Sequence, residues 1–165
     1  MVKYFFSEEY MNDKKLTNEA INIKPNRLSK QEIEDNFTDL HPPLSAIEAL
    51  IEADRCYFCY DAPCTIACPS DIDVPGFIQS IRSDNLTGAA DKILSENIFG
   101  GMCARDCPTE ELCQQACVRN DHEDKPVEIG LLQRYATDSV LNNGVKLFSR
   151  KEDTGKSIAV VGAGP

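Results

Sequence analysis

Four cysteines lie within thirteen positions of the segment RCYFCYDAPCTIACP, which covers residues 55–69. They are Cys56, Cys59, Cys64 and Cys68, and Pro69 follows the last of them directly. Cysteine thiolates bind zinc and iron–sulfur clusters, whereas packing alone rarely requires four thiols at such short spacing. The segment therefore predicts a metal or cluster site.

A second cysteine-rich segment, GGMCARDCPTEELCQQAC, covers residues 100–117. It contains Cys103, Cys107, Cys113 and Cys117, and Pro108 follows the second of these. Each segment thus has one Cys-Pro pair, in which proline turns the backbone away and has no amide N–H to leave unpaired. Two such segments suggest two clusters that share ligands across the segments.

The spacing of the thiols favours iron–sulfur ligation over zinc. The first segment reads C-x2-C-x4-C-x3-C-P, close to the run C-x2-C-x2-C-x3-C-P of bacterial ferredoxins, whose fourth cysteine binds the other cluster. Structural zinc uses two short knuckles with two to four residues between the thiols. Only some of these pairs match that template, and it leaves both Cys-Pro pairs unexplained, so zinc is the alternative.

Composition indicates a globular protein that acts in a reducing compartment. The 165 residues are 42% hydrophobic and 27% charged, and the net charge of -10 argues against nucleic acid as a partner. No apolar run approaches the ~18 residues of a membrane span, and the N-terminus lacks the features of a signal peptide. We therefore expect a cytoplasmic protein with no membrane partner, in which disulfides are disfavoured.

Helices are expected to position the cysteines. Capping boxes and N-cap residues predict where these helices begin. The predicted helices start at Ser29, Ser45, Asp73, Thr109 and Pro126, with a further helix in 85–97, and the last one extends to about Asn142. The Thr109 helix would carry Cys113 and Cys117 four positions apart, and a helical turn would likewise bring Cys64 and Cys68 to one face. No segment before residue 157 predicts a strand.

Four regions follow from these patterns. They are an N-terminal arm at 1–28, a helical domain at 29–148, a charged linker at 149–156 and the segment SIAVVGAGP at 157–165. The last segment predicts a strand that runs into Gly162-x-Gly164, as in the turn that holds a dinucleotide pyrophosphate. Because the complete fingerprint also needs a third glycine and a helix, we expect Gly162 and Gly164 to be cofactor residues only as part of a longer protein.

The segments CYFCYDAPCTIACP, GGMCARDCPTEELCQQAC and IGLLQRYATD resemble the N-terminal iron–sulfur domain of dihydropyrimidine dehydrogenase and of the related NAD(P)H-oxidising bacterial subunits. The small subunit of glutamate synthase is a more distant relative. The resemblance covers about residues 45–145, and IAVVGAGP looks like the start of the family's FAD-binding domain. It implies a mostly α, helical ferredoxin-like domain with two [4Fe-4S] clusters, followed by the first strand of a truncated Rossmann-type FAD domain.

The resemblance also implies a ligand set for each cluster. One cluster would take Cys56, Cys59, Cys64 and Cys117, and the other would take Cys68, Cys107, Cys113 and the side chain of Gln133. Cys103 would then bind no iron. The residues alone leave this open, because thiolate is the usual ligand, whereas Gln133 falls in an apolar helical stripe where a buried amide needs iron or a backbone group as its partner.

The function implied by the resemblance is electron transfer in a flavoprotein oxidoreductase. NAD(P)H would reduce FAD, and electrons would cross the clusters toward an FMN-containing catalytic domain or subunit that reduces a pyrimidine. The alternatives are an electron donor of the glutamate synthase type and a zinc-stapled interaction module without redox function. No catalytic pair is visible among the carboxylates, so this segment would be a transfer module without a complete catalytic site. Substrate, nicotinamide preference and assembly state stay open.

Overall fold

The computed structural model describes residues 28–39, 41–159, 161 and 162. The chain divides into two units, 1–40 and 41–165. The first unit contains helix α1 (Lys30–Asn36), which begins at the predicted capping box. The Ser29 side chain accepts the Glu32 N–H, and the Glu32 carboxylate accepts the Ser29 N–H at 2.8 Å. Apart from Leu28, the predicted arm at 1–28 lies outside the described residues.

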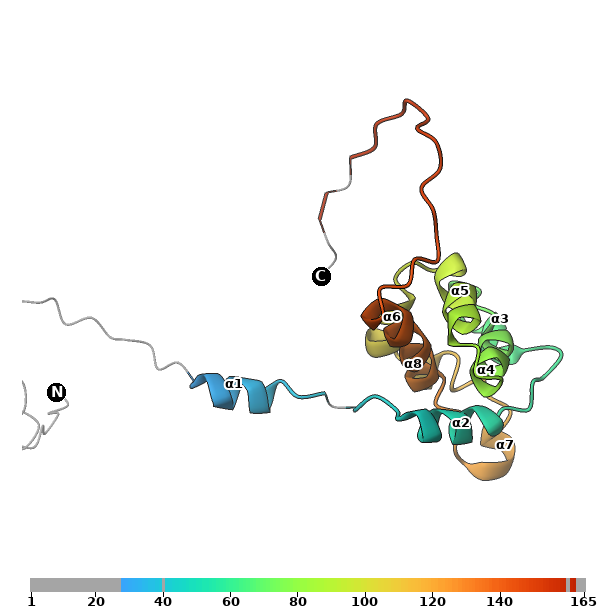
Figure 1. Cartoon of the computed structure of the whole chain (residues 1–165). Coiled ribbons are helices and arrows are strands. Elements are labelled where there is room, and N and C mark those ends of the chain that lie inside the picture. The colour runs from blue at the N-terminus through green and yellow to red at the C-terminus, as the bar shows by residue number, and fades with distance from the viewer. Residues whose placement is uncertain (1–27, 40, 160, 163–165) are drawn as a thin grey trace, which may run out of the picture. The chain divides into compact units, whose positions relative to one another are not determined.

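The second unit is built from short helices joined by irregular loops (Figure 1). The helices are α2 (Ala46–Asp54), α3 (Pro63–Ile66), α4 (Val74–Arg82), α5 (Leu86–Glu96), α6 (Gly100–Asp106), α7 (Asn120–Glu123) and α8 (Ile129–Asn142), with the 3-10 helix η2 (Thr109–Glu111) after α6. The described part of the chain contains no strand, as predicted for the segments before residue 157. Nor does it contain a helix that is long and apolar enough to span a membrane.

The starts of three helices follow from side chains that accept otherwise unpaired backbone N–H groups. Ser45 and Glu48 form the predicted capping box at α2. Asp73 accepts the Gly76 N–H at 3.0 Å at the start of α4, and Asn85 accepts the Gly88 N–H at 2.9 Å at the start of α5. These contacts confirm the predicted beginnings of the three helices.

The hydrophobic core lies between α2, α4, α5 and α8, and α8 also packs against α6. The fully buried side chains include Phe77, Ile78 and Ile81 of α4, Ile93 of α5 and Leu132 of α8. Burying such a side chain stabilises the folded state by about 1.5–3 kcal/mol relative to exposure. This core fixes the helices from which both cysteine-bearing loops start and to which they return.

Helix α8 begins three residues later than predicted. It starts at Ile129 instead of Pro126, because the Pro126 carbonyl accepts from Arg55 at 2.9 Å and the Gly130 N–H donates to the Gln114 side chain at 3.3 Å, in place of the first hydrogen bond of the predicted helix. The predicted end is confirmed. Gly144, at φ +62°, lies just beyond the helix, and the Val145 N–H donates to the Val140 carbonyl at 2.9 Å, as in a Schellman motif.

The predicted helix beginning at Thr109 is wrong in its length and its cap. Thr109 starts the single 3-10 turn η2, and its side chain caps nothing. The following residues form turns, because the Asn120 side chain donates to the carbonyls of Gln114 and Gln115 at 2.9 and 3.0 Å. A side chain that takes these carbonyls competes with helical hydrogen bonding. Cys113 and Cys117 therefore do not share a helical face.

The C-terminal segment carries no strand in its described residues, which are 157–159, 161 and 162. A strand needs a neighbouring strand for its backbone hydrogen bonds, and the described part of the chain provides none. Gly162 has φ +99°, a backbone region that favours glycine. Gly164 lies outside the described residues. The strand and glycine turn of a nucleotide-binding domain remain a prediction.

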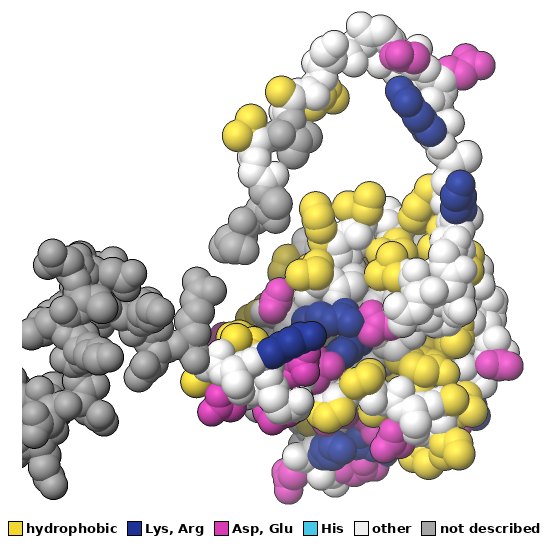
Figure 2. All heavy atoms as spheres, turned by 60° about the vertical axis from the view of Figure 1, so that its left-hand side comes forward, with side chains coloured by type: hydrophobic (Ala, Val, Ile, Leu, Met, Phe, Trp, Pro, Cys, Tyr) yellow, Lys and Arg dark blue, Asp and Glu magenta, His cyan; other side chains and the backbone are white. Residues whose placement is uncertain are grey.

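The surface of the described residues mixes charged and apolar side chains. On the face that Figure 2 shows, basic and acidic side chains lie beside one another between groups of hydrophobic side chains. One apolar hollow is lined by exposed side chains of Phe99, Met102, Leu141, Val145 and Phe148. None of the described residues that line this hollow is a cysteine, so it is separate from the candidate metal centre.

Candidate metal centre

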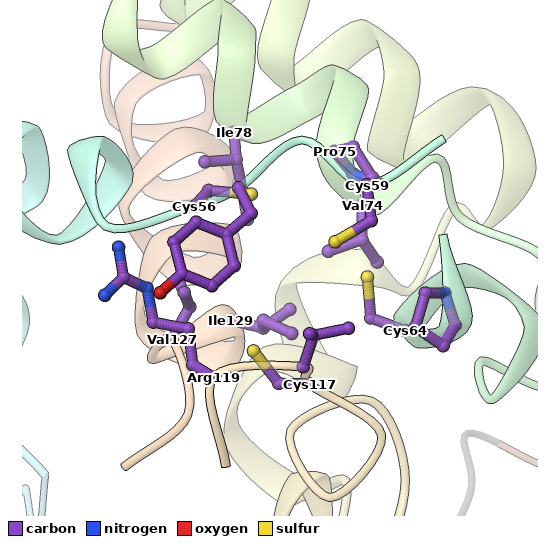
Figure 3. A pocket seen from close by; sticks show the side chains of 13 residues that line it. Cys56, Cys59, Cys64, Val74, Pro75, Ile78, Cys117, Arg119, Val127 and Ile129 are labelled. Carbon is purple, nitrogen blue, oxygen red and sulfur yellow. The ribbon is translucent and has the colours of Figure 1, made fainter. Parts of the chain in front are cut away.

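Four cysteines that come from both cysteine-rich segments line one cavity. Figure 3 shows the sulfur atoms of Cys56, Cys59, Cys64 and Cys117 directed toward a common space. The first three come from one loop, and Cys117 comes from the second cysteine-rich segment. These are the four residues that the resemblance assigned to one cluster.

Backbone conformation brings the first three thiols together. Cys56 directly follows the last turn of α2, where its N–H donates to the Ala53 carbonyl at 3.2 Å, and Cys64 lies on α3. Between them, Phe58 at φ +52° and Ala62 at φ +38° adopt the left-handed conformation that is unfavourable for residues other than glycine. This conformation costs of order 1–3 kcal/mol per residue and is concentrated at functional sites.

Burial makes the thiols of this cavity hard to ionise. The remaining walls include apolar side chains, among them Val74, Ile78 and Ile129. Burial raises the pKa of Cys64 to about 12, and the neighbouring thiol of Cys56 adds to the rise. Thiolates are the metal-binding form of cysteine, so four of them are favourable here only when a cation shares the cavity. The donor set fits the iron of a cluster.

A second cavity contains the remaining cysteines and a glutamine. Its lining includes Cys68, Cys103, Cys107, Cys113 and Gln133. Burial raises the pKa of Cys113 to about 11, and the neighbouring thiol of Cys68 adds to the rise. Burial likewise raises the pKa of Cys107 to about 11, and the neighbouring thiol of Cys103 adds to that rise. This cavity therefore favours a cationic group for the same reason as the first.

The short helix α3 does not bring Cys64 and Cys68 into the same cavity. It ends at Ile66, so Cys68 lies beyond it, and Cys64 and Cys68 line different cavities. Cys113 and Cys117 are divided in the same way. Each cysteine-rich segment thus contributes to both cavities, the crossed arrangement that the two Cys-Pro pairs suggested.

The second cavity has five candidate donors for a cluster that needs four. Gln133 is 8% exposed and its Nε2 donates to the Gly100 carbonyl at 2.7 Å. Its Oε1 accepts no hydrogen bond from the described residues. The Cys103 sulfur instead accepts a hydrogen bond from the Asn97 side chain at 3.2 Å. The glutamine oxygen is thus available as a ligand, and the Cys103 sulfur already has a protein partner.

Sequence reasoning missed three residues of the two cavities. Asn97 lines the second cavity, and Tyr57 and Arg119 line the first. Tyr57 and Arg119 are each within two residues of a cysteine, which was the available signal, whereas nothing local marked Asn97. All eight cysteines are free and partly buried, and no three described His, Cys, Asp or Glu side chains are arranged as ligands of a single metal ion.

Comparison with known proteins identifies an iron–sulfur family. Residues 33–145 match the family described as dihydropyrimidine dehydrogenase domain II, 4Fe-4S cluster. Over 133 residues, 80% of this chain, the sequence is 43% identical to the NAD-dependent dihydropyrimidine dehydrogenase subunit PreT of Escherichia coli (strain K12) and 42% identical to its Salmonella typhi homologue. It is 32% identical over 143 residues, 86% of this chain, to the glutamate synthase [NADPH] small chain of Escherichia coli (strain K12).

The aligned regions are only part of these relatives. They cover 32% of each of the two dihydropyrimidine dehydrogenase subunits and 29% of the glutamate synthase chain, so this chain spans about a third of their length. The family match nevertheless covers more than half of this chain. It confirms the predicted resemblance and the mostly helical iron–sulfur domain. The chain belongs to the dihydropyrimidine dehydrogenase domain II family of 4Fe-4S cluster domains.

Proposed function

We propose that this chain holds two [4Fe-4S] clusters and is the electron-transfer module of an NAD(P)H-dependent flavoprotein oxidoreductase. The observation that carries the proposal is the pair of separate cavities, each lined by at least four cysteines. When bound, such clusters exchange single electrons at potentials set by ligands, hydrogen bonds, charge and burial. The residues of this chain would supply the ligands, the hydrogen bonds, the nearby charges and the burial that set these potentials.

The first cluster has Cys56, Cys59, Cys64 and Cys117 as its proposed ligands. Apolar walls limit the access of water to these sulfurs. The Phe58 N–H donates to the Cys56 sulfur at 3.4 Å. Amide hydrogen bonds to ligand sulfur stabilise negative charge and so contribute to the potential.

The second cluster has Cys68, Cys107, Cys113 and Gln133 as its proposed ligands. Support for Gln133 comes from its burial and from the hydrogen bond that orients its amide, since Nε2 is held by the Gly100 carbonyl. A neutral amide oxygen in place of a thiolate makes the cluster one unit less negative. The two clusters would therefore differ in potential.

The whole protein is proposed to resemble the dihydropyrimidine dehydrogenase subunits more than glutamate synthase, because identity with them is 43% against 32%. It would then bind FAD through a domain that begins near Gly162 and Gly164, oxidise NAD(P)H and supply an FMN-containing partner that reduces a pyrimidine. A glutamate synthase-type electron donor is the alternative, since that relative matches a larger share of this chain.

Reductive titration of anaerobically purified protein tests the electron-transfer function. We expect a brown protein that bleaches reversibly, takes up about one electron per cluster and develops the EPR signals of reduced clusters. A colourless protein that contains zinc and takes up no electrons would contradict the proposal and support the structural zinc module.

A further inference from the structure

One cationic side chain belongs to the wall of the first cavity. Arg119 lies two residues after Cys117 and lines the cavity (Figure 3). Tyr57 is another of the lining residues. The Arg119 guanidinium lies 4.1 Å from the centroid of the Tyr57 ring, and its Nε donates to the Arg55 carbonyl. The side chain is 13% exposed. Stacking, hydrogen bonding and burial together fix the guanidinium beside the Tyr57 ring, which belongs to the cavity wall.

The two cavities differ in charge. The first has four thiols and an arginine, whereas none of the described residues that line the second is Lys, Arg, Asp or Glu. In the second cavity, the neutral Gln133 is the proposed replacement for one thiolate. The cation therefore accompanies the ligand set that carries the larger negative charge.

We propose that Arg119 raises the reduction potential of the first cluster by offsetting the negative charge of its fourth thiolate. This inference rests on the proposed function, because it needs a cluster bound by Cys56, Cys59, Cys64 and Cys117. A reduced cluster carries one more negative charge than the oxidised cluster, so a nearby cation stabilises the reduced form. Arg119 is here a residue that tunes the cluster and not a ligand.

The counterion of Arg119 is more exposed to solvent than Arg119 itself. Glu123 pairs with Arg119 and also with Arg55 at 3.2 Å, but its side chain is 39% exposed and it does not line the cavity. Solvent screens an exposed carboxylate more strongly than a largely buried guanidinium.

Redox titration of the anaerobic protein with both clusters tests the proposal. We expect Arg119→Gln to shift one of the two midpoint potentials to a more negative value while iron per chain stays at the wild-type level. Arg119→Lys keeps the charge and is expected to retain most of the wild-type potential. An unchanged potential in Arg119→Gln overturns the proposal. A shift in Arg119→Lys as large as that in Arg119→Gln also overturns it, because the effect would then come from lost packing and not from lost charge.

A change of opposite sign provides the second arm. Glu123→Gln removes the opposing charge and should shift the same midpoint to a more positive value, whereas damage to the cavity would not reverse the direction. This variant also carries the test if Arg119→Gln loses its cluster; a negative shift or no shift then overturns the proposal. Arg150→Gln, at an exposed position in the linker, lowers the net charge by the same amount as Arg119→Gln and should leave both midpoints unchanged.

Failure of this inference is distinguishable from failure of the proposed function. If the wild-type protein lacks two reducible clusters, the proposed function fails before any variant is compared. If wild-type and variants all contain two clusters and the midpoints do not follow the charge at residues 119 and 123, only the tuning by Arg119 is wrong. Gln133→Cys, which should move the other midpoint, assigns each potential to its cavity.

Discussion

The side-chain amide of Gln133 donates to the main-chain carbonyl of Gly100 at 2.7 Å. Gly100 is the first residue of α6, the helix that carries Cys103 and ends before Cys107. The hydrogen bond therefore connects α8 to α6 beside the second cavity and fixes which end of the amide is free. An ordinary buried glutamine satisfies both ends with protein groups, whereas Oε1 of Gln133 accepts no hydrogen bond from the described residues, which supports the proposal that it is a ligand.

Replacement of Gln133 by leucine should remove or convert one cluster. Leucine keeps the volume but supplies no donor atom, so we expect Gln133→Leu to lose up to about half of its iron. Gln114→Leu is a matched control, because Gln114 is another buried glutamine that lines neither cavity. Iron and acid-labile sulfide per chain measure the effect, and full retention of iron in Gln133→Leu would show that Gln133 is not a ligand.

Replacement of Cys103 by alanine should leave both clusters in place. Its sulfur accepts a hydrogen bond from Asn97, and the proposed ligand sets do not include it. Iron content and EPR signals of Cys103→Ala are therefore expected to match those of wild type. Loss of about half of the iron, together with full retention in Gln133→Leu, would exchange the roles of the two residues.

Gly100 allows α6 to approach α5 closely. A Cβ atom at this position would lie 2.4 Å from Cγ2 of the buried Ile93, whereas a Cβ at Gly101 would have its nearest contact at 3.4 Å. We expect Gly100→Ala to lower the free energy of unfolding by about 1–3 kcal/mol through overpacking. Gly101→Ala should be neutral or stabilising, because alanine is the better helix former. Thermal unfolding of the anaerobic proteins compares them, and equal melting temperatures would contradict this account.

Arg55 connects α2 to the segment that leads into α8. It pairs with Glu52 at 2.5 Å and donates to the carbonyls of Pro126 and Lys125 at 2.9 and 2.8 Å. Its side chain and that of Glu52 are 20% and 11% exposed, so Arg55→Ala leaves a largely buried carboxylate without its cation. We expect a loss of about 2 kcal/mol in the free energy of unfolding.

A second arginine provides the control for this variant. Arg82 pairs with Asp54 at 2.8 Å, but the two side chains are 49% and 64% exposed. Exposed pairs contribute little, so Arg82→Ala should change the free energy of unfolding by about 0.5 kcal/mol or less. The melting temperature of Arg55→Ala should therefore fall well below that of Arg82→Ala; similar values would mean that Arg55 contributes no more than a surface ion pair.

Local signals in the sequence predicted much of the fold. The capping residues Ser29, Ser45 and Asp73 each contact the backbone of the helix that they were predicted to start. The errors arise where distant residues decide the local structure. Arg55 donates to the Pro126 carbonyl before α8 across 71 positions of sequence, and no local pattern indicates such a contact.

The grouping of the cysteines was predictable only in part. Spacing indicated two cysteine-rich segments that exchange ligands, and the ferredoxin run, whose fourth cysteine binds the other cluster, agrees with Cys64 and Cys68 lining different cavities. The expected helical turn would have placed them on one face, and α3 is too short to do so. Arg119 could not be assigned to the first cavity, because its position depends on Tyr57 and the Arg55 carbonyl.

Iron, zinc and acid-labile sulfide per chain, measured on protein purified without oxygen, test the central claim most directly. Two [4Fe-4S] clusters predict about eight irons and as many sulfides per chain. One or two zinc ions without sulfide would contradict the account, since the cysteines would then hold a structural metal with no electron-transfer function.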